Sequence, residues 1–229
     1  MDSWERVGAA TGLGFVLLIV AATFFGSPPD FGAAADEVSR YYREDQRSIQ
    51  ASALVFAAAF ALLLWFLGTL HSVLANAERG GTSLATIAFG GGLVAIALFV
   101  ISLSLVVGAA FRPDETSPEV TRTLDDLSFL VLAPGACSLV VFFAATAAAV
   151  LRTGALPRWL GSLAALVALF QALGAGAVFD DSGPFAADGV FGYAAFFSFL
   201  LWILVASVVL LVGKRGSRQR PEALEAVLR

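Results

Sequence analysis

The sequence contains very few of the residues that bind metals, haem or redox groups. Among its 229 residues there are one cysteine, Cys137, and one histidine, His71. A single cysteine excludes a disulfide within the chain and any CxxC-type redox or zinc motif. A single histidine excludes paired-histidine haem ligation and the usual histidine-rich metal sites within one chain. We therefore expect no cofactor.

Charged residues are also scarce. Only 14% of the residues are charged and 59% are hydrophobic, whereas a soluble domain has about 25% charged and roughly 45–50% apolar residues. A soluble core has no room for this excess, so lipid is the expected solvent. No segment between the apolar runs is long enough to fold by itself, which predicts a single domain.

Six long apolar runs predict an all-α bundle of six transmembrane helices. Each run reaches the roughly 17–25 residues that a helix needs to cross a ~30 Å hydrocarbon layer. The predicted helices cover about 7–25, 49–75, 84–111, 124–151, 159–179 and 190–212. The transmembrane domain would then occupy residues 1–213, followed by a basic tail at 214–229. A cleaved signal peptide is not expected, because the leader is not clearly basic.

The distribution of basic residues predicts that both ends of the chain are cytoplasmic. With six spans, the termini and the second and fourth loops share one side of the membrane, and this side carries 9 basic residues against 5 on the other. Basic residues favour the cytoplasmic side, and the expected location is the plasma membrane. The 9 are Arg6, Arg79, Arg152, Arg158, Lys214, Arg215, Arg218, Arg220 and Arg229, and the 5 are Arg40, Arg43, Arg47, Arg112 and Arg122.

The segment 27–48 is the only sizeable element expected outside the membrane. It opens with a Pro-Pro-Asp turn signal, and residues 33–46 have a helix-forming composition with Val38, Tyr41 and Tyr42 near one face. This pattern predicts either a short amphipathic helix at the membrane interface or an extended start of the second spanning helix.

Pro134 and Gly135 lie within the fourth predicted helix. A proline inside a helix removes one backbone hydrogen bond and clashes with the preceding turn, so a kink is expected here. Carbonyl groups freed at a kink can line a ligand cavity or allow a hinge, although kinks also serve packing alone. Cys137 follows in the same helix, with no basic neighbour in sequence to activate its thiol.

Two further polar residues are candidates for contact with a ligand. Gln171 is the most polar residue deep in a predicted helix; such a group normally bonds across helices, and a polar ligand lining is the alternative. His71 lies near the cytoplasmic end of the second helix. Its imidazole could act as a proton-linked switch, or it could be an interfacial residue that caps the helix or touches lipid headgroups.

Carboxylates at the outer ends of two helices form a candidate metal site. Asp125 and Asp126 lie at the start of the fourth helix, and Asp180 and Asp181 follow the fifth. Carboxylates from two adjacent helix ends could hold a hard cation such as calcium. The alternative is a solvated acidic face.

Basic and aromatic residues at the cytoplasmic boundary predict contacts with lipid headgroups. A basic cluster directly after the last helix attracts anionic lipids, and a Pro-Arg-Trp sequence at the start of the fifth helix suits the headgroup layer. The residues expected to contact headgroups are Arg158, Trp159, Lys214, Arg215, Arg218 and Arg220.

Small residues recur in several predicted helices, among them Gly8 and Gly12 in the first and the run 90–92 in the third. Small residues let membrane helices approach closely. They therefore predict tight helix packing, either within the chain or across a homo-oligomer.

Three tracts carry a resemblance to a protein family. They are Gly154–Gly161, which enters the fifth helix, Tyr41–Arg47, and Leu64–Leu70. In these tracts the chain resembles uncharacterised six-helix membrane proteins of actinobacterial type, a family in the domain-of-unknown-function class. The resemblance implies a six-helix membrane fold over nearly the whole chain and implies no activity.

The leading functional hypothesis is non-enzymatic binding of a lipid, a hydrophobic small molecule or a partner protein. It rests on the sequence showing no nucleophile–base constellation and carboxylates only near the helix ends. One alternative is a small transporter or channel for a neutral or lipophilic substrate, and another is a membrane enzyme that uses the outer carboxylates around a metal. Nucleic-acid binding is not expected, because the basic residues are few and adjoin a membrane helix.

Overall fold

In the computed structural model, the residues described are 3–25, 29, 32–78, 83–179, 183–185 and 189–212. All regular structure in these residues is helical, which confirms the predicted all-α class. The elements are α1 (Ser3–Ala22), α2 (Ala35–Glu44), α3 (Gln46–Glu78), α4 (Leu84–Phe111), α5 (Pro118–Leu130), α6 (Leu132–Thr153), α7 (Arg158–Gly174), the 3-10 helix η1 (Ala175–Val178) and α8 (Val190–Val212).

Five helical stretches are long and apolar enough to cross a membrane. They are α3, α4, the pair α5–α6 (Pro118–Thr153), α7 with η1 (Arg158–Val178), and α8. The first helix contributes a shorter apolar stretch, Arg6–Ala22. These lengths and compositions support the prediction of a membrane protein.

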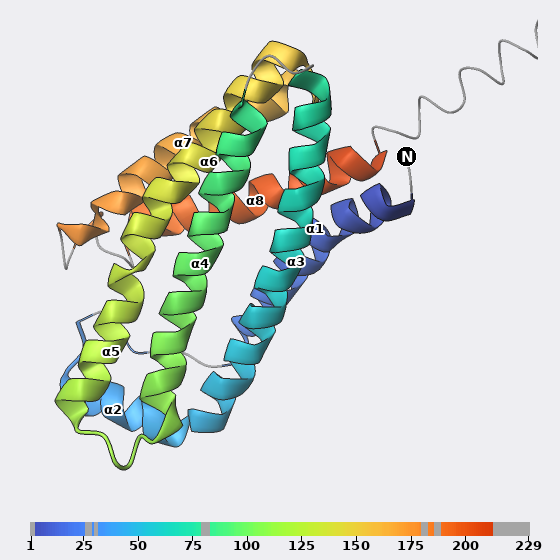
Figure 1. Ribbon diagram of the computed structural model, residues 1–229. Helices are drawn as coiled ribbons and strands as arrows, with labels where there is room; N and C mark the ends of the chain where they lie inside the picture. The colour runs from blue at the N-terminus through green and yellow to red at the C-terminus, as the bar shows by residue number, and fades with distance from the viewer. Residues whose placement is uncertain are drawn as a thin grey trace, which may run out of the picture.

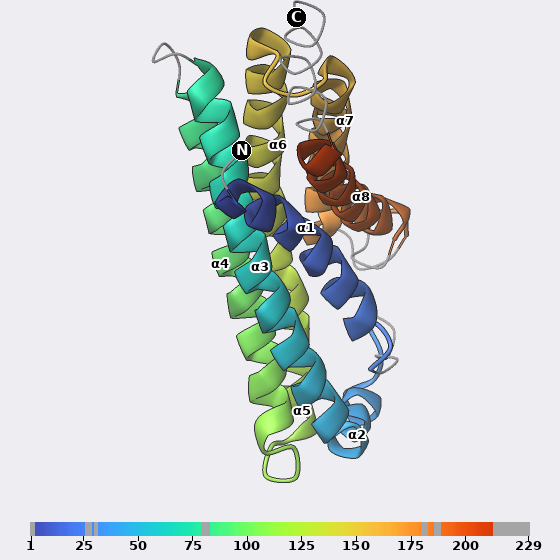
Figure 2. The ribbon, with the colours of Figure 1, turned by 90° about the vertical axis from the view of Figure 1, so that its right-hand side faces the viewer.

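The helices form a closed ring of contacts. The order around the ring is α1, α3, α4, α6, α7, α8 and back to α1, and each helix packs on the next. Figures 1 and 2 show α3, α4 and α6 running side by side, with α1 crossing α3 on the face that also carries α8. At one end of the bundle, α2 packs against α5 and lies across the direction of the long helices (Figure 1).

The segment before the second spanning helix is a separate amphipathic helix. The helix α2 ends at Glu44, a bend follows at Asp45, and α3 begins at Gln46. The apolar face of α2 is buried through Val38 and Tyr42. Of the two alternatives drawn from the sequence, the structure therefore has the separate helix.

Local sequence explains where the neighbouring helices begin and end. The Ser117 side chain accepts a hydrogen bond from the backbone N–H of Val120, and Pro118 occupies the first turn of α5, both of which favour a helix start. The following helix, α6, ends just before Gly154, whose φ of 68° is left-handed and favours glycine.

Small residues allow the closest helix contacts, as the sequence predicts. A Cβ atom added at Gly91 of α4 would lie 2.8 Å from both the Phe142 nitrogen and the Ser138 oxygen in the α6 backbone. On α1, a Cβ at Gly12 would collide with Ser207 and Phe66. These contacts lie within one chain, so the small residues at these positions serve packing of the bundle itself.

Large aromatic side chains fill part of the core between α6, α7 and α8. Trp202 of α8 is fully buried, and its ring packs edge-on against Phe143 of α6 at 5.3 Å between centroids. The Trp202 indole Nε1–H donates a hydrogen bond to the Leu160 carbonyl of α7 at 3.1 Å. A buried indole needs such a partner, and this one ties three neighbouring helices together.

Candidate ligand-binding cavity

A cavity of about 480 Å³ lies in the half of the bundle that is nearer α2. Residues of α1, α2, α3, α4, α5, α6 and α8 line it. Its volume falls in the range of about 300–1,000 Å³ typical of small-molecule sites. The cavity is thus large enough for a ligand and is built by most of the fold.

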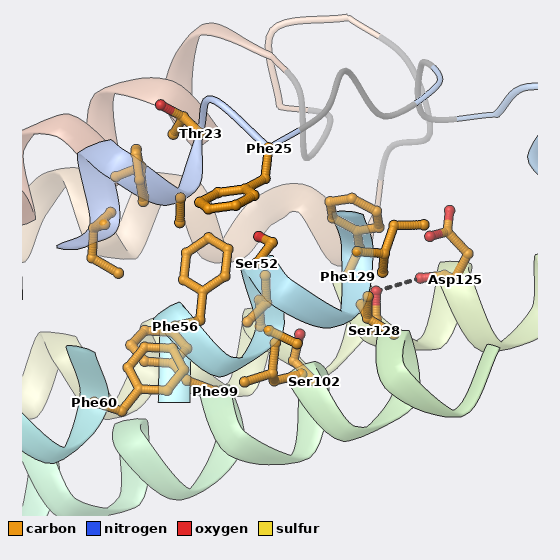
Figure 3. Close-up of a pocket in the computed structure, with 18 of the residues that line it drawn as sticks. Thr23, Phe25, Ser52, Phe56, Phe60, Phe99, Ser102, Asp125, Ser128 and Phe129 are labelled. Atoms are coloured by element: carbon orange, nitrogen blue, oxygen red, sulfur yellow. Dashed lines mark hydrogen bonds between the residues drawn. The ribbon is translucent and has the colours of Figure 1, made fainter. Parts of the chain in front are cut away.

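The walls of the cavity are dominated by phenylalanine rings from several helices (Figure 3). Phe60 of α3 and Phe99 of α4 stack with their centroids 5.6 Å apart, and Phe15 of α1 meets Phe199 of α8 edge-on at 5.8 Å. The eight phenylalanines in the lining are Phe15, Phe25, Phe56, Phe60, Phe99, Phe129, Phe196 and Phe199. Such walls favour an apolar ligand, since each ring exposed to the cavity gains from contact with hydrocarbon.

One end of the cavity is polar. Figure 3 shows Asp125 and Ser128 of α5 at this end, away from Phe60 and Phe99. The Tyr42 hydroxyl on α2 donates a hydrogen bond to Asp125 Oδ1 at 2.6 Å, and the Ser128 hydroxyl donates to the Asp125 backbone carbonyl at 2.7 Å. The polar end therefore consists of side chains from α2 and α5 that hold one another in place.

Burial and the charge of Asp125 both change the pKa of the Tyr42 phenol. Only 2% of Tyr42 is exposed. Burial, followed by the charge of Asp125 and the hydrogen bond to it, raises the pKa of the Tyr42 phenol well above its ordinary value. The phenol is therefore a permanent hydrogen-bond donor at neutral pH, and Asp125 Oδ1 is its acceptor.

Side-chain amides fix the same end of the bundle. The Gln46 Nε2 at the start of α3 donates to the Ala110 carbonyl at 2.9 Å, and Gln50 Nε2 donates to the same carbonyl at 3.4 Å. Carbonyls in the last turn of a helix have no partner within that helix, so these amides both satisfy α4 and join it to α3. The helices that frame the polar end are thereby held in register.

The four predicted metal ligands do not all lie in the described part of the chain. Asp125 lines the cavity, whereas Asp126 pairs with Arg122 at 3.7 Å between Oδ2 and Nε. Asp180 and Asp181 lie outside the described residues. Among the residues that the structure does describe, no group of three or more His, Cys, Asp or Glu side chains could hold a metal ion.

The predicted hinge residues lie next to the cavity wall. The helix is interrupted at Val131, between α5 and α6, and the bond from the Gly135 nitrogen to the Val131 carbonyl is long at 3.4 Å. Pro134 has no N–H for the Leu130 carbonyl, which explains the weakened turn. Phe129 and Leu132, on either side of the break, line the cavity, but Pro134 and Gly135 are not part of its lining.

Gln171 and His71 lie elsewhere. Gln171 is buried in α7, and its Nε2 donates to the Ala195 carbonyl of α8 at 2.8 Å, so it bonds across two helices. His71 is partly exposed on α3, with its ring 5.1 Å from that of Phe89 on α4. Neither residue is part of the cavity lining.

The predicted headgroup contacts are only partly described. Arg158 and Trp159 are exposed in the first turn of α7. The basic cluster after α8 lies outside the described residues: Lys214, Arg215, Arg218 and Arg220. The single cysteine, Cys137, is exposed on α6.

Sequence reasoning missed the Tyr42–Asp125 pair, whose members are 83 positions apart. One signal was present: Tyr42 shares the apolar face of α2 with Val38, and a tyrosine hydroxyl on a buried face requires a partner. The identity of that partner follows only from the packing of α2 on α5.

Comparisons with protein family models, curated proteins and solved structures find no match to this chain.

Proposed function

We propose that this protein binds a lipid or another hydrophobic small molecule in the cavity, and that it does so without catalysing a reaction. The observation that carries the proposal is the cavity of about 480 Å³ with eight phenylalanines in its walls and a polar group at one end. An apolar site with a few convergent polar groups is the usual form of a small-molecule site.

We further propose six spans, with both termini on the cytoplasmic side of the plasma membrane. The apolar stretch of α1, Arg6–Ala22, has 17 residues, and at 1.5 Å per residue it is about 26 Å long, which is close to the ~30 Å of the hydrocarbon layer. Together with the five longer stretches it completes six spans. The excess of basic residues supports the orientation, and α2 would then lie at the outer surface.

This placement puts the polar end of the cavity near the outer headgroups and its phenylalanine walls deeper in the membrane. Two lining residues, Phe25 just after α1 and Phe196 on α8, are 39% and 41% exposed. Their exposure supports an opening of the cavity on this side, where lipid chains would lie. A ligand could enter sideways from the bilayer.

The test compares two variants of the same helix. Ser102 lines the cavity, and Ser104 is an exposed residue of α4 that does not. Ser102→Phe places a ring inside the site, whereas Ser104→Phe adds the same ring on the outside of the bundle. The probe is dodecanol, offered to the protein in phosphatidylcholine nanodiscs and counted by native mass spectrometry.

We expect the wild type and Ser104→Phe to bind dodecanol equally, and Ser102→Phe to bind it at least about tenfold more weakly, which corresponds to about 1.4 kcal/mol. Thermal unfolding of both variants shows whether each remains folded. Equal binding by all three proteins, or no binding by the wild type, would contradict the proposal.

The weakened turn between Val131 and Gly135 favours a second function, passage of a neutral or lipophilic molecule through the bundle. This turn adjoins the cavity wall at Phe129 and Leu132, and a helix can bend where proline removes a backbone hydrogen bond. Flux of such solutes into vesicles that contain the protein tests this alternative. Permeability equal to that of empty vesicles counts against it.

A further inference from the structure

Asp125 occupies an unusual position in an otherwise uncharged cavity. Among the described residues that line the cavity, it is the only charged one. It is partly buried, and the walls around it are mostly apolar. A carboxylate in such surroundings loses part of its hydration and gains from a specific partner.

The described residues provide one hydrogen-bond donor to this carboxylate and no basic group. Tyr42 donates to Oδ1, which leaves Oδ2 as an acceptor on the same carboxylate. Within the described part of the chain, the ion pairs involve Asp126 and Glu115, and none involves Asp125. Arg40 and Arg43 of the adjacent α2 are exposed rather than directed into the cavity.

Resting on the proposed function, we infer that the ligand of this cavity is a cationic amphiphile, with an apolar body between the phenylalanine rings and a protonated amine bound by Asp125. The inference follows from charge complementarity, because an acidic group at the end of an apolar site lacks a basic partner among the described residues.

An ammonium group fits this end better than a neutral hydroxyl does. Both can donate a hydrogen bond to Oδ2, but a bond between two charged groups is about twice as strong as a neutral one. The attraction also grows in surroundings that hold less water. The Tyr41 ring also lines the cavity and packs edge-on against Tyr42, and the face of an aromatic ring attracts cations.

The experiment uses two probes with the same chain, dodecylamine and dodecanol, offered separately to the full-length protein in phosphatidylcholine nanodiscs at neutral pH. Native mass spectrometry measures the bound fraction of each. We expect the wild type to bind dodecylamine at least about tenfold more tightly than dodecanol, as a charge-assisted hydrogen bond implies. This comparison needs no variant and is independent of any folding defect.

Two neighbouring substitutions then assign the effect to one carboxylate. Asp125→Asn removes the charge that lines the cavity, and Asp126→Asn removes the charge that pairs with Arg122. We expect Asp125→Asn to abolish the preference for dodecylamine while it retains dodecanol binding. Asp126→Asn should keep the preference within about twofold, since long-range attraction alone is weakened by screening.

The outcomes separate this inference from the proposed function. If both probes bind the wild type equally, or if Asp126→Asn lowers the preference as much as Asp125→Asn, the amine site is refuted and the apolar cavity stands. If neither probe binds, the proposed function fails as well.

A final arm identifies the source of the amine. The same measurement in nanodiscs that contain phosphatidylethanolamine shows whether an amine-headed lipid remains bound. A retained lipid that Asp125→Asn releases supports a lipid headgroup as the natural partner, and dodecylamine binding without a retained lipid supports a free amine.

Discussion

Tyr42 joins the amphipathic helix α2 to α5 through a side-chain hydrogen bond. It lies on α2, it is 2% exposed, and its hydroxyl is 2.6 Å from Asp125 Oδ1 on α5. A hydrogen bond to a charged acceptor contributes more than one between neutral groups. The contact therefore stabilises the position of α2 and also orients the carboxylate toward the cavity.

Tyr42→Phe should lower the free energy of unfolding by about 1–2 kcal/mol. This loss is at the low end of the range for a hydrogen bond to a charged group, because Asp125 is partly exposed and can bind water instead. Thermal unfolding in nanodiscs measures the loss.

The matched control is Tyr41→Phe. Tyr41 is half-buried and donates no hydrogen bond that the structure shows to a described residue, so its change should stay below about 0.5 kcal/mol. Equal losses in the two variants would contradict the role assigned to the Tyr42 hydroxyl.

The different surroundings of Asp125 and Asp126 mark the limit of what the sequence could predict at this scale. Both were candidate metal ligands, since both lie near a helix start. Successive residues of a helix point about 100° apart, and here this difference directs one carboxylate to the cavity and the other to Arg122. The direction depends on how α5 is rotated against α2, which no local pattern encodes.

Among the helices, α4 and α6 approach each other closely at backbone level through Gly91. The Gly91 position faces two backbone atoms of α6, and the backbone cannot move aside as a flexible side chain can. Close backbone approach through small residues is the main way in which membrane helices gain packing energy.

Gly91→Ala should destabilise the bundle by about 1–3 kcal/mol, because the added methyl group would lie 2.8 Å from the Phe142 nitrogen and the Ser138 oxygen and would force the helices apart. The control is the preceding residue, since a Cβ atom added at Gly90 meets nothing within 4 Å. Gly90→Ala should be neutral or stabilising by up to about 1 kcal/mol through helix propensity. Thermal unfolding of both variants measures the change in stability. An equal loss of stability in both would rule out the close contact at Gly91 as the cause.

The sequence predicted tight packing at the small residues but not which of them would contact a neighbour. The run 90–92 contains three glycines, and Gly91 meets α6 while Gly92 meets Leu67 of α3 and Gly90 faces open space. The weakened turn before Pro134 was more predictable, because a proline removes a specific hydrogen bond whatever surrounds it. Local chemistry determines this turn, and tertiary contacts determine the packing.

For the whole molecule, the long apolar runs were sufficient to predict an all-α membrane bundle. The cavity was not predictable. Its phenylalanines come from α1, α3, α4, α5, α8 and the turn after α1, and in the sequence they look like ordinary lipid-facing or core residues. Only the ring of helix contacts brings them to one place.

The proposed orientation can be tested on intact cells. In a Cys137→Ala background, Asp114→Cys places a thiol in the exposed loop between α4 and α5, and Asn76→Cys places one at the exposed end of α3. We expect a membrane-impermeant maleimide to label the first thiol in intact cells and the second only after permeabilisation. The reverse pattern would place the termini outside, and labelling of both in intact cells would contradict an odd number of spans between them.

The most direct test of the central claim is the mass of the protein released from its native membrane in nanodiscs, without any added probe. We expect a reproducible adduct of defined mass on the wild type and on Ser104→Phe, and its loss from Ser102→Phe, which places a ring inside the cavity. An adduct that survives Ser102→Phe unchanged, or a wild type that carries none under conditions that preserve bound lipid, would contradict a ligand in this cavity.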